Sequence, residues 1–379
     1  MFKNLFTGKV DPLLALRGIA ALMVVVFHCG IIPRIGFLTP NGTVAVYVFF
    51  ILSGYLMGKA FLANRYELNF KGITRFYKSR ILRICPLYYF LTFLFIFWLH
   101  PFLLHPQNFT NLIKVLAFNF QHTQPFYFIA TFWSLSVEMQ FYLILPFFVL
   151  LLTKFIKTTK QRVALIIGLF GLIELYKYIA IHYFVEKSAD LYNASTMLIT
   201  DNLIPNLEFF LAGIAVNLLI LNKDKLTWLN FPKIFSLLGL FVLYLTSSTG
   251  YFYSNYLAIL AVMIYIFSYE KDAYNSSIKN TLSNHPLNTL GNLSYGVYLW
   301  HLPLSEQIHS TLLNQDIFIQ IYMYHQTIFY FNFLFLTLLA SISFAAMTYR
   351  FIEMPFNKLK FTNLNLKWHF QQRFSFQKS

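Results

Sequence analysis

Residues 13–30, LLALRGIAALMVVVFHCG, form a segment that is long and apolar enough to cross a bilayer, yet it contains Arg17 and His28. About 20 apolar residues span a hydrocarbon core of roughly 30 Å. A charged side chain that faces lipid there is costly, so ionisable groups in such segments face protein or a water-filled cavity. In a helix, positions 17 and 28 share one face and lie about 16 Å apart along the axis. The segment therefore predicts a polar stripe along the first transmembrane helix.

The composition of the whole chain agrees with a membrane protein. Of its 379 residues, 58% are hydrophobic and only 11% are charged, which is far from the average of water-soluble domains. We expect an all-α, polytopic transmembrane bundle of about ten helices, forming one domain over residues 1–360 and followed by a short basic and aromatic tail at 361–379. The apolar segments that hydropathy predicts as spans are 13–32, 43–62, 81–99, 128–152, 163–184, 203–221, 234–250, 253–269, 290–311 and 327–350.

The distribution of Lys and Arg predicts the orientation. Most of the 29 basic residues precede the first segment, fall in every second loop, or follow the last segment. Because basic residues gather on the cytoplasmic side, we expect both termini in the cytoplasm. The net charge of +15 then orients the protein against anionic lipid, and a nucleic-acid partner is unnecessary. The two cysteines, Cys29 and Cys85, have no disulfide or metal-ligand spacing, and we expect no metal.

Two ionisable side chains inside the spans are candidates for chemistry. A neutral imidazole can accept a proton near pH 7, which makes His28 a candidate general base. Glu138 lies near the middle of the fourth span and should be paired, protonated or in a polar cavity. It could orient an imidazole, as the third group of a triad does. The alternative for both is a structural role, in which each hydrogen-bonds a neighbouring helix. Glu174 and Lys177 in the fifth span are interpreted as a structural pair.

Arg80 and Arg83 share a face where the third span is expected to begin. Guanidinium groups bind phosphates well, so the pair could hold an anionic cofactor at the cytoplasmic mouth. The alternative is that these residues only orient the helix.

Further polar residues are candidates for substrate binding. Ser53 and Tyr55 place hydroxyls deep in the second span, in a segment that could equally serve helix packing. His301 is a second intramembrane histidine, in the ninth span. Glu353, at the end of the tenth span, can pair with Arg350.

Six stretches occur in one order along residues 13–356: LRGIAALMVVVFH, FFILSGY, RILRICPLYY, FWSLSVEMQFYLILP, LSYGVYLWHLP and YRFIEMPF. Together they resemble the membrane acyltransferase 3 family, bacterial integral-membrane O-acyltransferases that modify cell-surface glycans. The resemblance implies ten or eleven transmembrane helices in the bacterial cytoplasmic (inner) membrane. It implies an acyl-CoA donor, usually acetyl-CoA, held from the cytoplasm. It places the essential Arg/His pair on Arg17 and His28 and the basic RxxR element on Arg80 and Arg83.

The sequence departs from the family pattern in two places. The fourth-span motif often carries two acidic residues, but Met139 follows Glu138 here, which puts any role that needs two acids in doubt. Some members carry a C-terminal serine-hydrolase-like domain, and we expect a form without it because too few residues follow the last span. Transfer to the acceptor would then fall to the membrane domain or a separate partner.

The mechanism expected from these residues is acyl transfer to a glycan or lipid-linked saccharide. Arg80 and Arg83 would bind the phosphates of acetyl-CoA and Arg17 its pantetheine arm. His28 would deprotonate a sugar hydroxyl that attacks the thioester, although a covalent acyl-histidine is also open. Ser53, Tyr55 or an Arg would stabilise the oxyanion. The rival hypothesis is a transporter or flippase for a lipid-linked glycan, which would use the same buried charges as a pathway.

Overall fold

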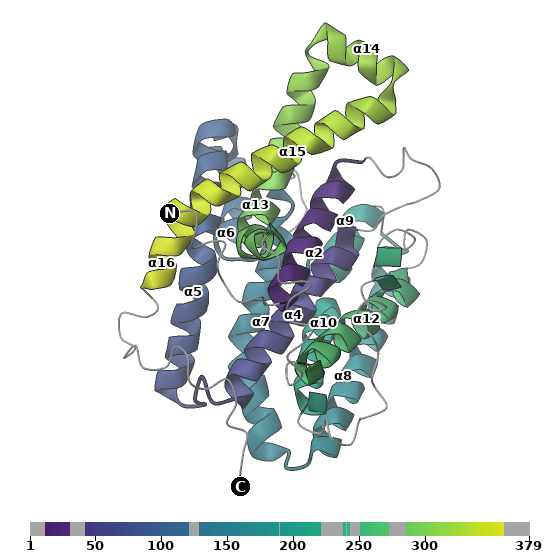
Figure 1. The fold of residues 1–379 in the computed structure, drawn as a ribbon. Helices are drawn as coiled ribbons and strands as arrows, with labels where there is room; N and C mark the ends of the chain where they lie inside the picture. The colour runs from purple at the N-terminus through teal and green to yellow at the C-terminus, as the bar shows by residue number, and fades with distance from the viewer. Residues whose placement is uncertain are drawn as a thin grey trace.

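The computed structural model describes residues 12–30, 42–120, 129–188, 190–220, 238–239, 241–242, 251–272 and 286–359, and all regular structure in these ranges is helical (Figure 1). The long helices pack as one bundle, in agreement with the predicted all-α class. Their bounds are α2 (Pro12–His28), α4 (Gly42–Leu62), α5 (Phe70–Phe93), α7 (Phe132–Leu150), α8 (Thr159–Ile179), α10 (Leu203–Ile220), α12 (Tyr251–Asp272), α13 (Pro286–Leu313) and α15 (Gln326–Thr348).

Shorter helical segments connect or extend the long helices. The α-helical ones are α6 (Phe109–Leu116), α9 (Leu191–Ser195), α14 (Asp316–Tyr324) and α16 (Met354–Lys358). Two 3₁₀ turns span Pro101–Leu104 and Pro106–Asn108. Turns of π-helix cover Leu94–Leu99, Leu151–Phe155, Ala180–Val185, Thr196–Thr200 and Tyr349–Glu353.

Several helices are long and apolar enough to cross a membrane. Six such segments lie in the described ranges: Gly42–Leu62, Phe70–Leu99, Phe132–Phe155, Thr159–Val185, Met197–Ile220 and Gln326–Lys358. Pro12–His28 and Tyr256–Phe267 are shorter apolar helices. The chain is therefore a multi-pass membrane protein. Of the ten predicted spans, the one at 234–250 lies outside the described residues except for 238–239 and 241–242, which are helical. The predicted tail at 361–379 also lies outside them.

The third span begins earlier than its hydropathy predicts. The sequence indicates a start at residue 81, whereas α5 begins at Phe70, where the side chain of Asn69 accepts a hydrogen bond from the amide of Gly72. The first turns of α5 are basic, so an apolar window does not detect them. Arg80 consequently lies about 15 Å along the helix instead of in the loop before it.

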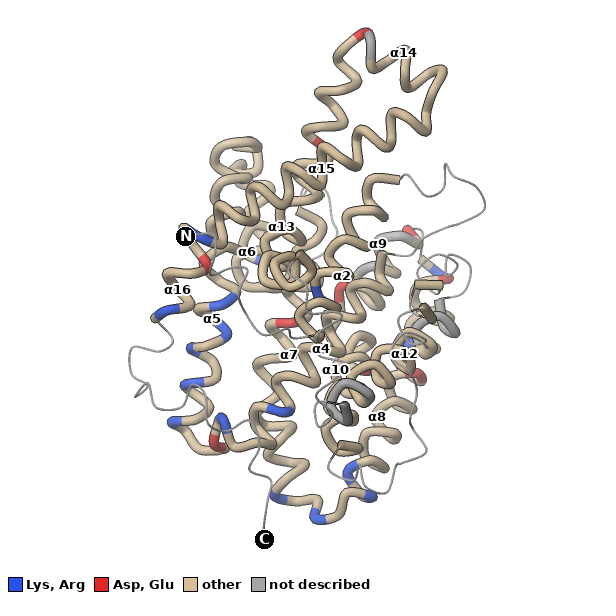
Figure 2. Tube along the Cα trace, in the orientation of Figure 1, with Lys and Arg blue, Asp and Glu red and all other residues tan. Residues whose placement is uncertain are grey.

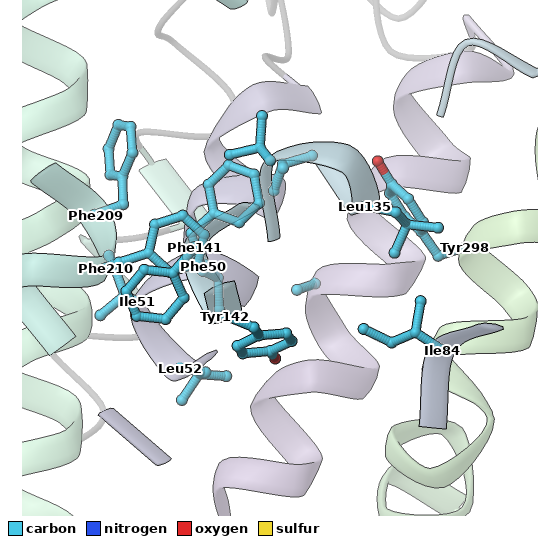
Figure 3. Close-up of a cluster of buried hydrophobic side chains, with 14 of the residues drawn as sticks. Phe50, Ile51, Leu52, Ile84, Leu135, Phe141, Tyr142, Phe209, Phe210 and Tyr298 are labelled. Carbon is cyan, nitrogen blue, oxygen red and sulfur yellow. The ribbon is translucent and has the colours of Figure 1, made fainter. Parts of the chain in front are cut away.

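Glycine allows α4 and α10 to touch through their backbones. A Cβ atom on Gly54 would lie 2.1 Å from the carbonyl oxygen of Phe210, and one on Gly213 would lie 2.1 Å from that of Ile51. Small residues at helix interfaces in membranes permit this close approach. Beside the crossing, the ring of Phe210 stacks on Phe141 at 4.0 Å and on Phe50 at 4.7 Å (Figure 3). The close contact between α4 and α10 and these stacked rings together form part of the core of the bundle.

The first helix packs along α13 in the same direction. Gly18 of α2 lies against Gly291 of α13, where a Cβ atom would come within 2.9 Å of backbone atoms. Ten residues further along both helices, His28 meets His301. By contrast, α2 runs antiparallel to α4, since Phe27 packs on Gly42 and Arg17 lies over Phe49. These directions fit a chain that crosses the membrane alternately.

Charge is distributed unevenly along the bundle axis. Lys and Arg gather at one end, around the start of α5 and the connection between α7 and α8, and few lie at the opposite end, where α14 meets α15 (Figure 2). The positive-inside rule predicts that the basic end faces the cytoplasm, and this orientation stays a prediction.

Candidate active site

A short hydrogen-bonded network surrounds Glu138 in the middle of the bundle. The hydroxyl of Ser53 on α4 donates to Glu138 Oε1 at 2.5 Å, and the hydroxyl of Tyr142 donates to the same oxygen at 2.6 Å. Tyr142 follows Glu138 by one helical turn on α7, a spacing that brings side chains together. Sequence analysis predicted Ser53 and Glu138 separately and missed Tyr142, although this i,i+4 spacing was available as a signal. The network holds the carboxylate in one orientation.

Arg17 connects this carboxylate with two further arginines. Arg17 lies within electrostatic range of Glu138, Arg80 and Arg83. The guanidinium of Arg80 lies over the ring of Tyr142, 5.6 Å from its centre, and that of Arg17 lies 5.8 Å from the ring centre of Phe49. Among the described residues, the buried Nε atoms of Arg17 and Arg80 have no hydrogen-bond partner. Because buried cationic groups without partners are costly, this arrangement suits an anionic ligand. We call Arg17, Arg80, Arg83 and Glu138 the arginine cluster.

Glu353 and Tyr295 extend the arginine cluster toward α13. The π-helical turn Tyr349–Glu353 directs Glu353 inward, where only 1% of the residue is exposed. Tyr295 interacts electrostatically with Glu353, Arg83 and Glu138, and its hydroxyl donates to the carbonyl of Ile84 on α5 at 2.7 Å. Sequence analysis named Glu353 but missed Tyr295, which no local pattern distinguishes from an ordinary core tyrosine.

The two intramembrane histidines form a pair. His301 Nε2 lies 3.2 Å from His28 Nδ1, and the ring centres are 4.9 Å apart. The ring of His28 is exposed at the end of α2, whereas His301 has no exposed surface. Sequence analysis assigned His301 to substrate binding. The ring is completely buried, in contact with the Tyr298 carbonyl and His28, and the role in substrate binding stays a prediction.

Glu138 is not the group that orients His28. The hydrogen-bonding partners of the carboxylate are Ser53 and Tyr142. The ring of His28 instead contacts the Val24 carbonyl at 3.0 Å and His301 at 3.2 Å. The predicted third-group role therefore does not fit Glu138. Its position beside the arginines suits a part in shaping the anion site.

Tyr55 lies away from the arginine cluster. Its hydroxyl accepts a hydrogen bond from Lys59 Nζ at 3.1 Å, and its carbonyl accepts one from the Asn217 side chain at 3.0 Å. Two residues along a helix correspond to a rotation of about 200°, so Tyr55 and Ser53 cannot both face Glu138. The structure thus brings together Ser53, Glu138, Arg17, Arg80 and Arg83, and leaves Tyr55 on another face of α4.

A second buried cluster of charges lies between α8 and α10. Lys177 Nζ is 2.7 Å from Glu208 Oε1 and 2.9 Å from Glu174 Oε1. Glu208 has no exposed surface and Lys177 is also buried. The pairing of Glu174 with Lys177 agrees with the structural interpretation of these residues, whereas Glu208 was not considered, although an acidic residue inside an apolar segment is itself a signal. We call these three residues the lysine cluster.

Comparison with known proteins identifies the family. Residues 13–346 match the family model described as an acyltransferase domain. The peptidoglycan O-acetyltransferase OatA of Listeria monocytogenes is 25% identical over 92% of this chain, and the O-acetyltransferase OatA of Staphylococcus aureus is 25% identical over 91%. The matches cover 56% and 57% of these relatives, so the chain spans little more than half their length. No solved structure matches. The chain therefore belongs to the membrane acyltransferase 3 family.

Proposed function

We propose that this protein transfers an acetyl group from acetyl-CoA to a hydroxyl of a cell-surface glycan at the bacterial cytoplasmic membrane. The observation that carries the proposal is the placement, on α2, of an exposed imidazole at one end and a guanidinium of the arginine cluster at the other. The imidazole provides a base, and the guanidinium provides part of an anion site. The names of the relatives favour acetyl as the acyl group and peptidoglycan as the first acceptor to test.

The arginine cluster would hold the donor. Acetyl-CoA carries phosphates, for which guanidinium groups are suited by charge and by their paired N–H donors. The buried Nε atoms of Arg17 and Arg80 lack partners among the described residues, so binding an anion would supply hydrogen bonds that the protein does not. From there the pantetheine arm would follow α2 and bring the thioester to His28.

The chemistry at His28 is a proton transfer coupled to acyl transfer. His28 takes the proton of the acceptor hydroxyl while that oxygen attacks the thioester carbonyl. The C–S bond then breaks, the acetyl group stays on the sugar oxygen, and the thiolate receives the proton from the imidazolium. No proton or electron is gained or lost overall. His28 is an exposed residue at the end of the bundle opposite the basic loops, and the acceptor would arrive from that end.

The direct test is reconstitution of purified protein in proteoliposomes with acetyl-CoA that carries an isotopic label. We expect label to appear on the sugar hydroxyls of added peptidoglycan fragments or of a lipid-linked precursor, together with an equal amount of free CoA. Mass spectrometry locates the label. Movement of the lipid-linked glycan across the membrane, with acetyl-CoA left intact, would contradict the proposal and support a transporter.

A further inference from the structure

The hydrogen bonds of the histidine pair define where its protons lie. His301 Nδ1 is 2.7 Å from the carbonyl oxygen of Tyr298, and because a carbonyl only accepts, Nδ1 of His301 carries the hydrogen. In the neutral ring Nε2 of His301 is then an acceptor. It faces His28 Nδ1 at 3.2 Å, and this atom also lies 3.0 Å from the Val24 carbonyl. The Val24 carbonyl and His301 Nε2 are both acceptors, which favours the tautomer of His28 with hydrogen on Nδ1 and the basic lone pair on Nε2.

We propose that His301 is a positioning residue for His28: it fixes the tautomer with hydrogen on Nδ1 and directs Nε2 of His28 to the acceptor hydroxyl. This inference rests on the proposed function, in which His28 is the base. His301 itself neither gains nor loses a proton. As His28 takes a proton on Nε2 it becomes a cation, and its Nδ1–H bond to His301 strengthens because the donor is now charged.

The packing around the pair explains how the geometry is maintained. The close contact of Gly18 with Gly291 sets the register of α2 against α13, and the two histidines meet ten residues further along both helices. His301 is completely buried, so its ring is held by packing on all sides. A carboxylate in this position would bring an additional charge into an apolar segment, which is costly. A neutral imidazole orients His28 without that cost.

Substitutions of His301 test whether its acceptor atom matters. His301→Gln keeps a side-chain oxygen that can accept from His28 Nδ1–H, whereas His301→Leu keeps bulk and removes the acceptor. We expect His301→Leu to lower kcat by about 10²-fold, as misplacement of a catalytic group does, with KM for acetyl-CoA little changed. His301→Gln should recover much of this loss. His309→Gln, on the same helix and with its ring against Phe329 and Phe333, is the matched control and should retain wild-type kcat.

Nitrogen NMR of the wild-type protein with ¹⁵N-labelled histidine provides a measurement that does not depend on the variants folding. We expect His28, assigned by loss of its signals in His28→Ala, to show a protonated Nδ1 and an unprotonated Nε2. The opposite tautomer would overturn the inference, as would wild-type kcat in His301→Leu or equal losses in the Leu and Gln variants. His28→Ala distinguishes the proposed function from the role of His301. If it stays active, the proposed function fails, whereas an inactive His28→Ala beside an active His301→Leu rejects only the role of His301.

Discussion

The arginine cluster and the lysine cluster are both charged groups inside an apolar bundle, and they differ in how their cations are paired. In the lysine cluster, one ammonium group lies within 2.9 Å of two carboxylates. In the arginine cluster, Arg17 interacts electrostatically with Glu138, Arg80 and Arg83, and the Nε atoms of Arg17 and Arg80 have no hydrogen-bond partner among the described residues. The ammonium group of the lysine cluster is therefore paired within the protein, although Glu208 Oε2 has no partner among the described residues, whereas the two guanidinium Nε atoms are left without one.

This difference suggests that the lysine cluster is structural and that the arginine cluster is part of the functional site. Removing one partner of a buried ion pair leaves an uncompensated charge and destabilises the fold strongly. In the arginine cluster the cost of burying two Nε–H groups without partners is offset elsewhere in the fold, and an anionic ligand would recover part of it. We therefore expect substitutions in the lysine cluster to affect stability and substitutions in the arginine cluster to affect donor binding.

The largest expected effect on binding follows from removing two arginines. Arg80→Ala with Arg83→Ala deletes two charged donors, each worth about 1.5–3 kcal/mol in a hydrogen bond, so the affinity for acetyl-CoA should fall roughly 10²- to 10⁴-fold. Isothermal titration calorimetry with purified protein measures this loss. The matched control is Arg75→Ala with Lys78→Ala, which removes the same charge from exposed positions of α5. Equal losses in both double variants would show that net charge, and not this pair, attracts the donor.

The lysine cluster should show the opposite behaviour. Lys177→Met keeps the volume of the side chain but leaves Glu208 buried without its cation, so the free energy of unfolding should fall by about 3–5 kcal/mol. Turnover per folded molecule should remain close to wild type. Chemical denaturation in detergent, with activity normalised to folded protein, measures both quantities. Lys154→Met, at an exposed position, is the control. A stable but inactive Lys177→Met would show that the lysine cluster takes part in the reaction and would contradict the distinction between the two clusters.

The smallest expected effect lies within the Glu138 network. Ser53→Ala removes one hydrogen bond to Glu138 Oε1 and leaves the hydrogen bond from Tyr142 in place. We therefore expect the binding free energy of acetyl-CoA to weaken by at most about 1.5–3 kcal/mol. Tyr142→Phe removes the other donor while keeping the ring under Arg80. If the losses of the two single variants simply add in the double variant, the two hydroxyls act on the carboxylate independently. Calorimetric titration of both single variants and the double variant provides this thermodynamic cycle.

Hydropathy was sufficient to locate most of the helices, because an apolar run of about 20 residues has few structural alternatives in a bilayer. It misplaced the start of α5, where basic residues continue a helix that Asn69 caps. The site was harder to predict. Individual polar residues in apolar spans could be named from the sequence, but their partners could not, since His28 and His301 are 273 positions apart.

Glu138 and His28 show why partners are hard to predict from the sequence. A sequence indicates that Glu138 and His28 are both unusual in a membrane helix, but it does not indicate that their hydrogen-bonding partners differ. That information comes from helix packing: the contact of Gly18 with Gly291 aligns α2 with α13 and so brings His301, and not Glu138, to the imidazole.

The role of His28 as the base is tested most directly by the rate of acetyl transfer in His28→Gln. Glutamine keeps similar volume and hydrogen bonding but cannot take a proton. With equal amounts of folded protein in proteoliposomes, saturating acetyl-CoA and peptidoglycan fragments, we expect the rate to fall by about 10²- to 10⁴-fold while calorimetric binding of acetyl-CoA is retained. A wild-type rate of transfer in this variant would contradict the account and leave His28 as a packing residue.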